Sequence, residues 1–319
     1  MRVAAIDCGT NTLRLLVAEP GPDGRPVDVL RRMEVVRLGE GIDSTGGIAP
    51  AALERTLAAL RDYAGEIRSL GAERVRMVAT SATRDARNRQ LFLDGATSLL
   101  GVPPEVLSGD QEAALTFGGA AADLVARGFD APAPLLVVDI GGGSTELVLG
   151  GALLAGAPAA SITAAVSVDI GCVRLTERHL GPAEGGPYPN ALVEALVADV
   201  QGALAGAAES VDLHAAGTLV AVAGTAKTVA ALAMDLPTYD AERIHLSRVG
   251  AADVAAVAER LVASSAAERA AMGPMHPGRV DVITAGSLVL REVVRAVGLD
   301  SVVASERDIL DGVAASLLG

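Results

Sequence analysis

The 319-residue sequence has no tryptophan and only three tyrosines and three phenylalanines, and its 26 Lys+Arg against 39 Asp+Glu give a formal charge of −13. Nucleic-acid binding relies on positive charge near the phosphates and on aromatic side chains that stack on bases. The composition therefore argues against a nucleic-acid-binding protein. The same excess of negative charge disfavours binding to an anionic membrane surface.

Cysteine is also scarce. Cys8 and Cys172 are too few for a disulfide framework and lack the spacing of a metal-binding motif, so we expect buried thiols in a reducing cytoplasm. Asp7 interrupts the apolar segment that a signal peptide would need. The longest uncharged stretch, residues 147–168, contains several glycines and a proline, which disfavours a membrane helix. A cytoplasmic protein is predicted.

What the sequence has in abundance is apolar residues, which make up 50% of the chain, and a length that suits two domains with a core each. Strand-like and helix-like patterns alternate, which is typical of an α/β fold. Ser305 and Asp308 resemble a capping box ahead of a C-terminal helix. Besides a hairpin over residues 2–18, we expect strands over 75–80, 105–107, 135–139 and 219–223, and helices over 50–70, from about 110, and over 226–233.

An internal repeat organises these elements. Residues 6–12 align without a gap with residues 138–144, and the similarity continues over residues 13–17 and 145–149. In each copy a strand leads into an Asp-x-Gly turn with a hydroxyl residue, and the chain then continues as a second strand. Repeated units of this kind indicate duplicated structure. The repeat therefore predicts two domains that each open with the same β-hairpin.

The two turns have the composition of phosphate sites. Glycines allow successive backbone N–H groups to point into one concavity that binds phosphate oxygens, and Thr10, Thr12 and Ser144 add hydroxyl groups. Asp7 and Asp139 would repel phosphate unless a divalent cation such as Mg²⁺ lies beside them. Ordinary glycine hairpins are the alternative, which the matching second copy disfavours. Because both copies continue as strands, a P-loop or dinucleotide-binding fold is also disfavoured.

Together with residues 223–225, the two turns resemble the phosphate and adenosine loops of the actin, heat-shock ATPase and sugar-kinase superfamily. Five motifs narrow this resemblance to the exopolyphosphatase and guanosine pentaphosphate phosphohydrolase (Ppx/GppA) family, and they span almost the whole chain. One departure is Gln111, which replaces the first Glu of the family's Ser-Gly-x-Glu-Glu-Ala signature and leaves Glu112 as the candidate catalytic glutamate. The motifs lie at residues 6–12, 79–88, 107–113, 139–146 and 279–283.

The resemblance implies an α/β fold of two actin-like (ribonuclease H-like) domains around an interdomain active-site cleft. We expect residues 1–117 plus about 301–319 in the first domain and about 118–300 in the second. The chain is similar to the short, two-domain form, since longer members carry an additional C-terminal helical domain. A homodimer and a preference for short polyphosphate chains are expected on the same basis.

The implied activity is Mg²⁺-dependent release of terminal orthophosphate from inorganic polyphosphate. Glu112 is the expected general base for water, Arg84 would stabilise charge on the transferred phosphoryl group, and Asp139 and Asp7 would hold the metal. Arg84 and Asn88 are four residues apart, so we expect them on one helical face. Another divalent ion, and K⁺ beside it, are open alternatives. The expected substrate-binding residues are Gly9, Thr10, Asn11, Asn88, Gly141, Gly142, Gly143, Ser144, Glu146, Gly224 and Thr225.

Several alternatives stay open at this point. Hydrolysis of guanosine pentaphosphate would use the same site, and the sequence does not separate it from polyphosphate hydrolysis. An actin-like ATP-binding kinase or a nucleotide-sensing module without activity would also fit residues 223–225. Lys227 could contact a distal phosphate or simply be solvated, and Arg14 could contact phosphate or be the polar position of an alternating strand.

Overall fold

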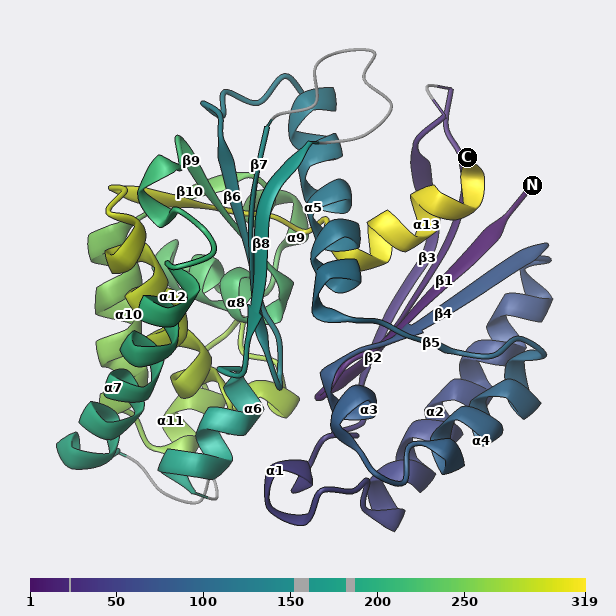
Figure 1. Cartoon of the computed structure of the whole chain (residues 1–319), viewed down its shortest axis with the longest axis horizontal. Coiled ribbons are helices and arrows are strands. Elements are labelled where there is room, and N and C mark those ends of the chain that lie inside the picture. Colours follow the sequence, from purple (N-terminus) through teal and green to yellow (C-terminus); the bar gives the residue numbers. More distant parts are fainter. Residues whose placement is uncertain (23, 152–160, 182–186) are drawn as a thin grey trace. The chain divides into compact units, whose positions relative to one another are not determined.

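The computed structural model describes residues 1–22, 24–151, 161–181 and 187–319 (Figure 1). Two compact units are formed by the chain. The first comprises Met1–Gly119 and Ile309–Gly319, and the second comprises Ala120–Asp308. Each unit contains one β-sheet with helices packed against it, as the α/β pattern predicts.

The first unit contains a five-stranded sheet in the order β3-β2-β1-β4-β5. Antiparallel pairing joins β1, β2 and β3, whereas β4 is parallel to β1 and β5 is parallel to β4. The central strand β1 is buried along its whole length, which explains its nearly continuous apolar sequence. The strands are β1 (Val3–Cys8), β2 (Thr12–Pro20), β3 (Pro26–Val35), β4 (Arg74–Ala79) and β5 (Glu105–Val106).

Helices cover both faces of this sheet. Residues of α2 (Pro50–Ser69) and α4 (Gln90–Leu100) share one core with Ile6 and Leu15, whereas α13 (Ile309–Leu318) packs on Val3, Ala5 and Leu16 of the other face. Pro50 occupies the first turn of α2, where its missing N–H costs no hydrogen bond, as its sequence pattern predicts. The other helices are α1 (Ile42–Thr45), α3 (Ser81–Asp85) and α5 (Gly109–Ala126), which continues into the second unit.

The second unit contains a six-stranded sheet in the order β10-β11-β9-β6-β7-β8. Its strands β6, β7 and β8 are joined by antiparallel pairing, and β9 is parallel to both β6 and β11. The strands are β6 (Leu135–Ile140), β7 (Thr145–Gly150), β8 (Ile162–Val168), β9 (Thr218–Val222), β10 (Ser247–Gly250) and β11 (Ser301–Ala304).

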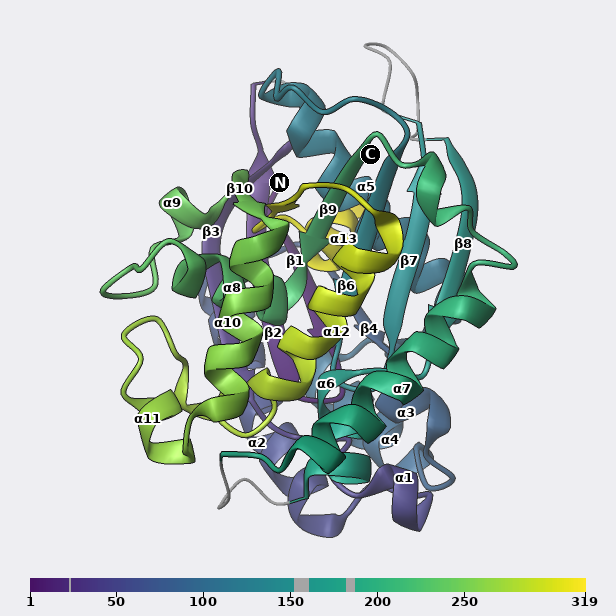
Figure 2. The ribbon, with the colours of Figure 1, turned by 90° about the vertical axis from the view of Figure 1, so that its left-hand side faces the viewer.

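A large apolar core lies between this sheet and its helices, and Figure 2 shows α10 and α12 in front of the strands. The long helix α12 contacts α7, α8 and α10. The helices are α6 (Cys172–Leu175), a π-helix (Thr176–Leu180), α7 (Asn190–Ala207), α8 (Ala223–Ala233), α9 (Ala241–Ile244), α10 (Ala251–Ala263), α11 (Ala266–Ala270) and α12 (Ile283–Val297).

The strand orders confirm the duplicated hairpins. Reading β8-β7-β6-β9-β11 against β3-β2-β1-β4-β5 gives the same order and the same strand directions, and β10 is an addition at one edge. The boundary near the C-terminus differs from our expectation. Because β11 pairs with β9, residues 301–308 belong to the second unit, and the return to the first unit begins at Ile309.

The predicted capping box at Ser305 is wrong. Its hydroxyl group bonds to the backbone of Arg307, and α13 begins only at Ile309. A capping box forms instead at α11, where Ser265 and Glu268 bond to each other's backbone N–H groups.

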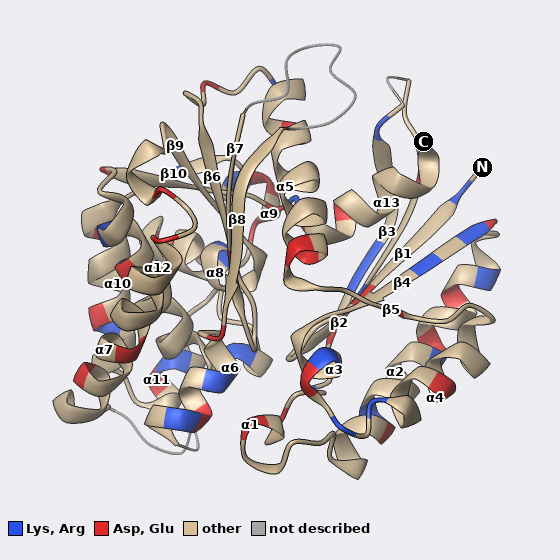
Figure 3. Cartoon of the chain, viewed as in Figure 1, with Lys and Arg blue, Asp and Glu red and all other residues tan. Residues whose placement is uncertain are grey.

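Across the described residues, the structure contains no helix that is both long enough and apolar enough to span a membrane. Residues 152–160 of the uncharged stretch lie outside the described residues. Figure 3 shows acidic and basic residues together on α10, whereas the charged residues of α7, Glu194 and Asp199, are both acidic.

Candidate phosphate and metal site

The first turn, residues 9–11, connects β1 to β2. The amide of Gly9 donates to the carbonyl of Thr12 at 3.0 Å, and the carbonyl of Thr10 accepts from Gly39 N–H at 2.9 Å. The carbonyl of Asn11 accepts from the two amides that follow β3. Gly39 must lack a side chain, because a Cβ atom there would lie 2.2 Å from Cγ2 of Thr10. The first turn is thus held by the segment after the third strand.

The second turn, residues 141–144, connects β6 to β7 in the same way. Gly141 N–H donates to the carbonyl of Ser144 at 3.0 Å. The carbonyl of Gly142 accepts from α6 at 2.8 Å, and that of Gly143 accepts from Gly171 N–H at 3.2 Å. A Cβ atom on Gly171 would lie 2.3 Å from the carbonyl carbon of Gly142, so this close approach requires glycine.

These hydrogen bonds orient both turns for anion binding. In each turn the carbonyl groups face the segment that follows the third strand. Because N–H and C=O point in opposite directions in a trans peptide, the intervening amide groups face away from that segment. Successive backbone amides that face the same way in a turn can form a concavity that binds phosphate oxygens. The predicted phosphate residues of each turn are therefore held together locally, within each unit.

A first row of side chains crosses β1, β2 and β3, where Asp7 lies opposite Arg14 and Arg14 lies opposite Met33. Arg14 donates to Oδ2 of Asp7 through Nε at 2.9 Å and through Nη2 at 2.5 Å. Asp7 is only 3% exposed. Burial of this carboxylate is therefore compensated by a guanidinium group in the same hairpin, and Arg14 is a partner of Asp7 in this structure.

A second row crosses β6, β7 and β8 at the equivalent positions, with Asp139 opposite Glu146 and Glu146 opposite Ser167. Asp139 is 6% exposed and Glu146 is 1% exposed. Ser167 Oγ donates to Oε1 of Glu146 at 2.7 Å. Like charges directly opposite each other on neighbouring strands destabilise a sheet. A hard divalent cation would compensate the pair, so the donor set fits Mg²⁺.

The described ranges hold no group of three or more His, Cys, Asp or Glu residues that could bind a metal. Mg²⁺ is held in many proteins by one or two carboxylates, while water and substrate phosphates complete its coordination. Two carboxylates beside a phosphate-binding turn are therefore a sufficient protein contribution.

Glu112 and Arg84 are brought together, as their proposed roles require. Arg84 Nη1 lies 3.3 Å from Oε2 of Glu112 and donates to the carbonyl of Leu107 at 3.0 Å. Glu112 is 8% exposed and lies in the first turn of α5. A partly buried carboxylate beside a guanidinium group can hold a water molecule and accept its proton near a charged phosphate.

Gln111, the departure from the family signature, has a structural explanation. Its side-chain oxygen accepts from Ser108 N–H at 2.9 Å, and the backbone N–H of Gln111 donates to Ser108 Oγ at 3.3 Å. This is the reciprocal pair of a capping box, in which Gln serves as well as Glu. The substitution preserves the start of α5 and therefore the placement of Glu112.

The prediction that Arg84 and Asn88 share a helical face is wrong, because α3 ends at Asp85 and Ala86 is extended. The amide of Asn88 bonds to both backbone groups of Ile48: Oδ1 accepts from its N–H at 2.7 Å, and Nδ2 donates to its carbonyl at 2.9 Å. These bonds assign Asn88 to holding the loop at Ile48.

At the start of α8, the guanidinium group of Arg279 lies against Gly224. A Cβ atom on Gly224 would lie 1.7 Å from Nη1 of Arg279, so only glycine permits this contact. Thr225 is buried below it, at 2% exposure. The motif at residues 279–283 contains Arg279 but indicates no role for it, because Gly224 is distant in sequence. Lys227 is not simply solvated, because its ammonium group lies 3.1 Å from the carboxylate of Glu306.

Both thiols are buried and free of disulfides, as predicted. Burial and the nearby charge of Asp7 raise the pKa of Cys8 well above its usual value. Burial also raises the pKa of Cys172 to about 11. Neither thiol is ionised at neutral pH, so neither is a candidate nucleophile.

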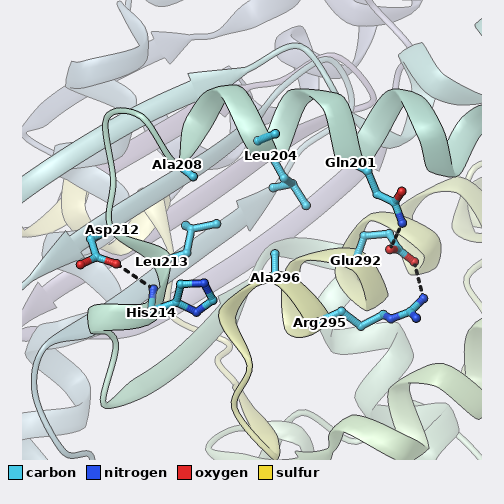
Figure 4. Close-up of a pocket in the computed structure, with 10 residues that line it drawn as sticks. Gln201, Leu204, Ala208, Asp212, Leu213, His214, Glu292, Arg295 and Ala296 are labelled. Atoms are coloured by element: carbon cyan, nitrogen blue, oxygen red, sulfur yellow. Dashed lines mark hydrogen bonds and ion pairs between the residues drawn. The ribbon is translucent and has the colours of Figure 1, made fainter.

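A groove of about 750 Å³ lies elsewhere in the second unit, between α7, α12 and the 3₁₀ segment Leu213–Ala215 (Figure 4). Glu292 lies at one end, where its carboxylate accepts from Gln201 at 2.9 Å, and His214 lies at the other. None of the predicted site residues lines this groove.

Known proteins share both the sequence pattern and the fold of this chain. The sequence model described as "Ppx/GppA phosphatase family" matches residues 17–319. A relative named "Exopolyphosphatase 2" from Mycobacterium tuberculosis is 47% identical over an alignment of 332 positions, which covers 100% of this chain and 99% of the relative.

Solved structures with the same fold extend along the full chain. An exopolyphosphatase-like protein superposes with a TM-score of 0.89 at 42% identity, covering 98% of this chain and 97% of the other. The PPX-GPPA enzyme of Aquifex aeolicus superposes with a TM-score of 0.78 at 28% identity, covering 99% of both chains. These similarities confirm the two-domain, actin-like fold class.

Proposed function

The chain belongs to the Ppx/GppA phosphatase family, and from that premise we propose that it is an exopolyphosphatase. Its reaction is the Mg²⁺-dependent hydrolysis of inorganic polyphosphate with release of terminal orthophosphate. The observation that carries the proposal is the buried Asp139–Glu146 pair, which lies at the two strand ends joined by the second turn. The proposal thus assigns phosphate binding to this turn and cation binding to the two carboxylates that flank it.

Asp139 and Glu146 are the proposed holders of Mg²⁺. When bound, this ion neutralises charge on the phosphoryl oxygens and so lowers the barrier to attack by an oxygen nucleophile. Glu146 was expected among the phosphate-binding residues, but a carboxylate opposite Asp139 is better suited to the cation. Asp7 is the weaker metal candidate, because Arg14 already holds its carboxylate.

The backbone amides of Gly142, Gly143 and Ser144 are proposed to bind substrate phosphate oxygens, and those of the first turn are proposed to do the same. The hydrogen bonds to the carbonyl groups of each turn fix its peptide units before substrate binds. The amides of the turn therefore lose little freedom on binding. Arg84 adds a charged donor with a planar fork that matches phosphate oxygens.

Glu112 is the proposed general base. It accepts a proton from a water molecule whose oxygen forms a bond to the terminal phosphorus. The bond from that phosphorus to the bridging oxygen breaks, the bridging oxygen departs with the shortened polyphosphate chain, and the attacked phosphoryl group becomes orthophosphate. Arg84, at 3.3 Å from Oε2, holds the carboxylate in place during this step.

Arg279 supports a phosphate chain over an adenine nucleotide as the substrate. Residues 223–225 resemble an adenosine loop, but the guanidinium group of Arg279 covers Gly224. A base that stacked on the Gly224 backbone would have to displace this group. A polyphosphate, in contrast, would be attracted by it.

The test is phosphate release measured with malachite green on polyphosphates of defined length, on guanosine pentaphosphate and on ATP. Release from polyphosphate that requires Mg²⁺ and stops in excess chelator is expected, because the acidic pair would otherwise repel the substrate. Full activity in excess chelator would contradict the proposed metal role. Release from guanosine pentaphosphate alone would indicate the other activity named for the family, and ATP binding without any release would indicate a sensor.

The same assay measures the predicted preference for short chains. Sedimentation equilibrium of the purified chain tests the predicted homodimer, which would appear as twice the mass of 32.1 kDa.

A further inference from the structure

The second row ends on a residue for which sequence analysis found no role. Ser167 lies in β8, directly opposite Glu146 in β7, which in turn lies opposite Asp139 in β6. Directly paired residues point to the same face of a sheet, so the three side chains form one line across three strands.

The contact within this line is short and specific. Ser167 Oγ donates to Oε1 of Glu146 at 2.7 Å, and the carboxylate that it holds is 1% exposed. A hydrogen bond from a hydroxyl group to a carboxylate is stronger than one between neutral groups. A buried carboxylate with such a bond loses rotational freedom about its last torsion angle, which is otherwise broad.

The first row provides an internal comparison. At the position equivalent to Ser167 it has Met33, which has no donor group, and at the position equivalent to Glu146 it has Arg14. The hydroxyl group is therefore present in the row with two carboxylates and absent from the row whose carboxylate is neutralised by arginine. Because the strand pairing is the same in both rows, the presence of the hydroxyl group goes with the presence of a second carboxylate to orient.

We propose that Ser167 is a positioning residue for the divalent cation: it orients Glu146 so that this carboxylate and Asp139 bind one ion together. This inference rests on the proposed metal role of the acidic pair. Residues that hydrogen-bond to metal ligands set ligand orientation, and their loss weakens metal binding by roughly 10- to 100-fold.

Ser167→Ala removes the donor, and Ser167→Thr retains a hydroxyl group in a residue well suited to a strand. The matched control is Thr163→Ala in the same strand, because Thr163 donates to the carbonyl of Leu149 at 3.0 Å and does not contact Glu146. Mn²⁺ is the probe, since it is also a hard cation that prefers oxygen ligands and its free form is measured directly by electron paramagnetic resonance.

We expect Ser167→Ala to raise the dissociation constant for Mn²⁺ by roughly 10-fold. Ser167→Thr should restore most of this affinity, and Thr163→Ala should leave it unchanged. In steady-state kinetics, Ser167→Ala should raise the Mg²⁺ concentration needed for half-maximal rate while the KM for polyphosphate at saturating Mg²⁺ stays constant.

Equal Mn²⁺ affinity in Ser167→Ala and the unmodified chain would overturn the inference, as would an equal loss in Thr163→Ala. Thermal unfolding of each variant without metal shows whether the fold is retained. Failure of the proposed function looks different: an unmodified chain that binds Mn²⁺ but releases no phosphate from polyphosphate would refute exopolyphosphatase activity and leave the role of Ser167 intact.

Discussion

The two hairpins share a backbone and differ in charge. Each has an aspartate at the same place before its turn, and each turn is closed by the same 3.0 Å hydrogen bond, from Gly9 to Thr12 in one and from Gly141 to Ser144 in the other. Across the sheet, however, Asp7 faces Arg14, whereas Asp139 faces Glu146. One buried acid thus lies opposite a basic residue, and the other lies opposite a second acid.

This difference shows how duplicated structure can acquire two roles. In the first hairpin, the guanidinium group of Arg14 compensates the negative charge of Asp7 by bonding to its Oδ2. Two adjacent carboxylates in a buried site are favourable only with a proton or a cation beside them. The first hairpin thus carries its own counter-charge, and we propose that the second responds to a metal ion.

The largest effect should come from neither hairpin but from the base on α5. Glu112→Gln is expected to lower kcat for polyphosphate by about 10²- to 10⁴-fold, because the amide cannot accept the proton of water. Mn²⁺ affinity should stay unchanged, since the metal is assigned to the second hairpin. Asp110→Asn is the matched control, as Asp110 lies in the same helical turn and is exposed. A Glu112→Gln protein with normal phosphate release would refute this mechanism.

The same substitution, Asp to Asn, in each hairpin tests whether the two aspartates have different roles. Asp139→Asn should weaken Mn²⁺ binding by at least roughly 100-fold, beyond the effect expected for an indirect partner. Asp7→Asn should weaken it far less, because Arg14 already neutralises Asp7. Equal losses in the two variants would show that both aspartates bind the ion and that the charge difference between the rows does not divide their roles.

In contrast to Mn²⁺ affinity, the free energy of unfolding should depend on the charged pair of the first hairpin. Arg14→Met leaves the buried Asp7 without its guanidinium partner and is expected to lower the free energy of unfolding by about 2 kcal/mol, less than the loss of a fully buried pair because Arg14 keeps some contact with water. The side chains of Arg14 and Asp7 are 16% and 4% exposed.

A double variant, Arg14→Met with Asp7→Asn, is the control for this effect. It should be more stable than Arg14→Met alone, because the unpaired charge is gone. Urea unfolding is measured for the unmodified chain, for Arg14→Met, for Asp7→Asn and for the double variant. Additive losses in the double variant would mean that the two residues are not coupled.

The smallest effect concerns an acid of the second unit that has internal partners, as Asp7 does. Burial alone would raise the pKa of Asp123, but the hydrogen bond from His245 at 2.8 Å and the adjacent Arg127 outweigh it and hold the pKa below the usual value. A carboxylate with a depressed pKa stabilises the fold above its unfolded pKa and loses that contribution as the pH falls through its folded pKa.

Asp123→Asn should therefore cost about 1 kcal/mol of stability at pH 7. The difference from the unmodified chain should shrink as the pH falls below about 4, the pKa of an unfolded aspartate. Unfolding midpoints measured across this pH range check the sign. Mn²⁺ affinity should not change, and a change would mean that Asp123 also contributes to cation binding.

Local patterns predicted the elements well. The apolar spacing and Pro50 located α2 to within a residue at its end, and the aligned Asp-x-Gly segments predicted both hairpins. Two of the errors involve partners that are distant in sequence. Asn88 bonds to Ile48, and β11 pairs with β9 some eighty residues earlier, so neither contact has a local signal.

The sequence by itself predicted the duplicated turns, the aspartate that precedes each of them and the glutamate at the start of α5. These features depend on backbone conformations that short motifs encode. Strand register, in contrast, decides which side chain each aspartate faces. The contrast between Asp7 with Arg14 and Asp139 with Glu146 and Ser167 exists only once three strands are paired. Its physical basis is burial, since the same charges in water would interact weakly, whereas inside the fold they require a partner.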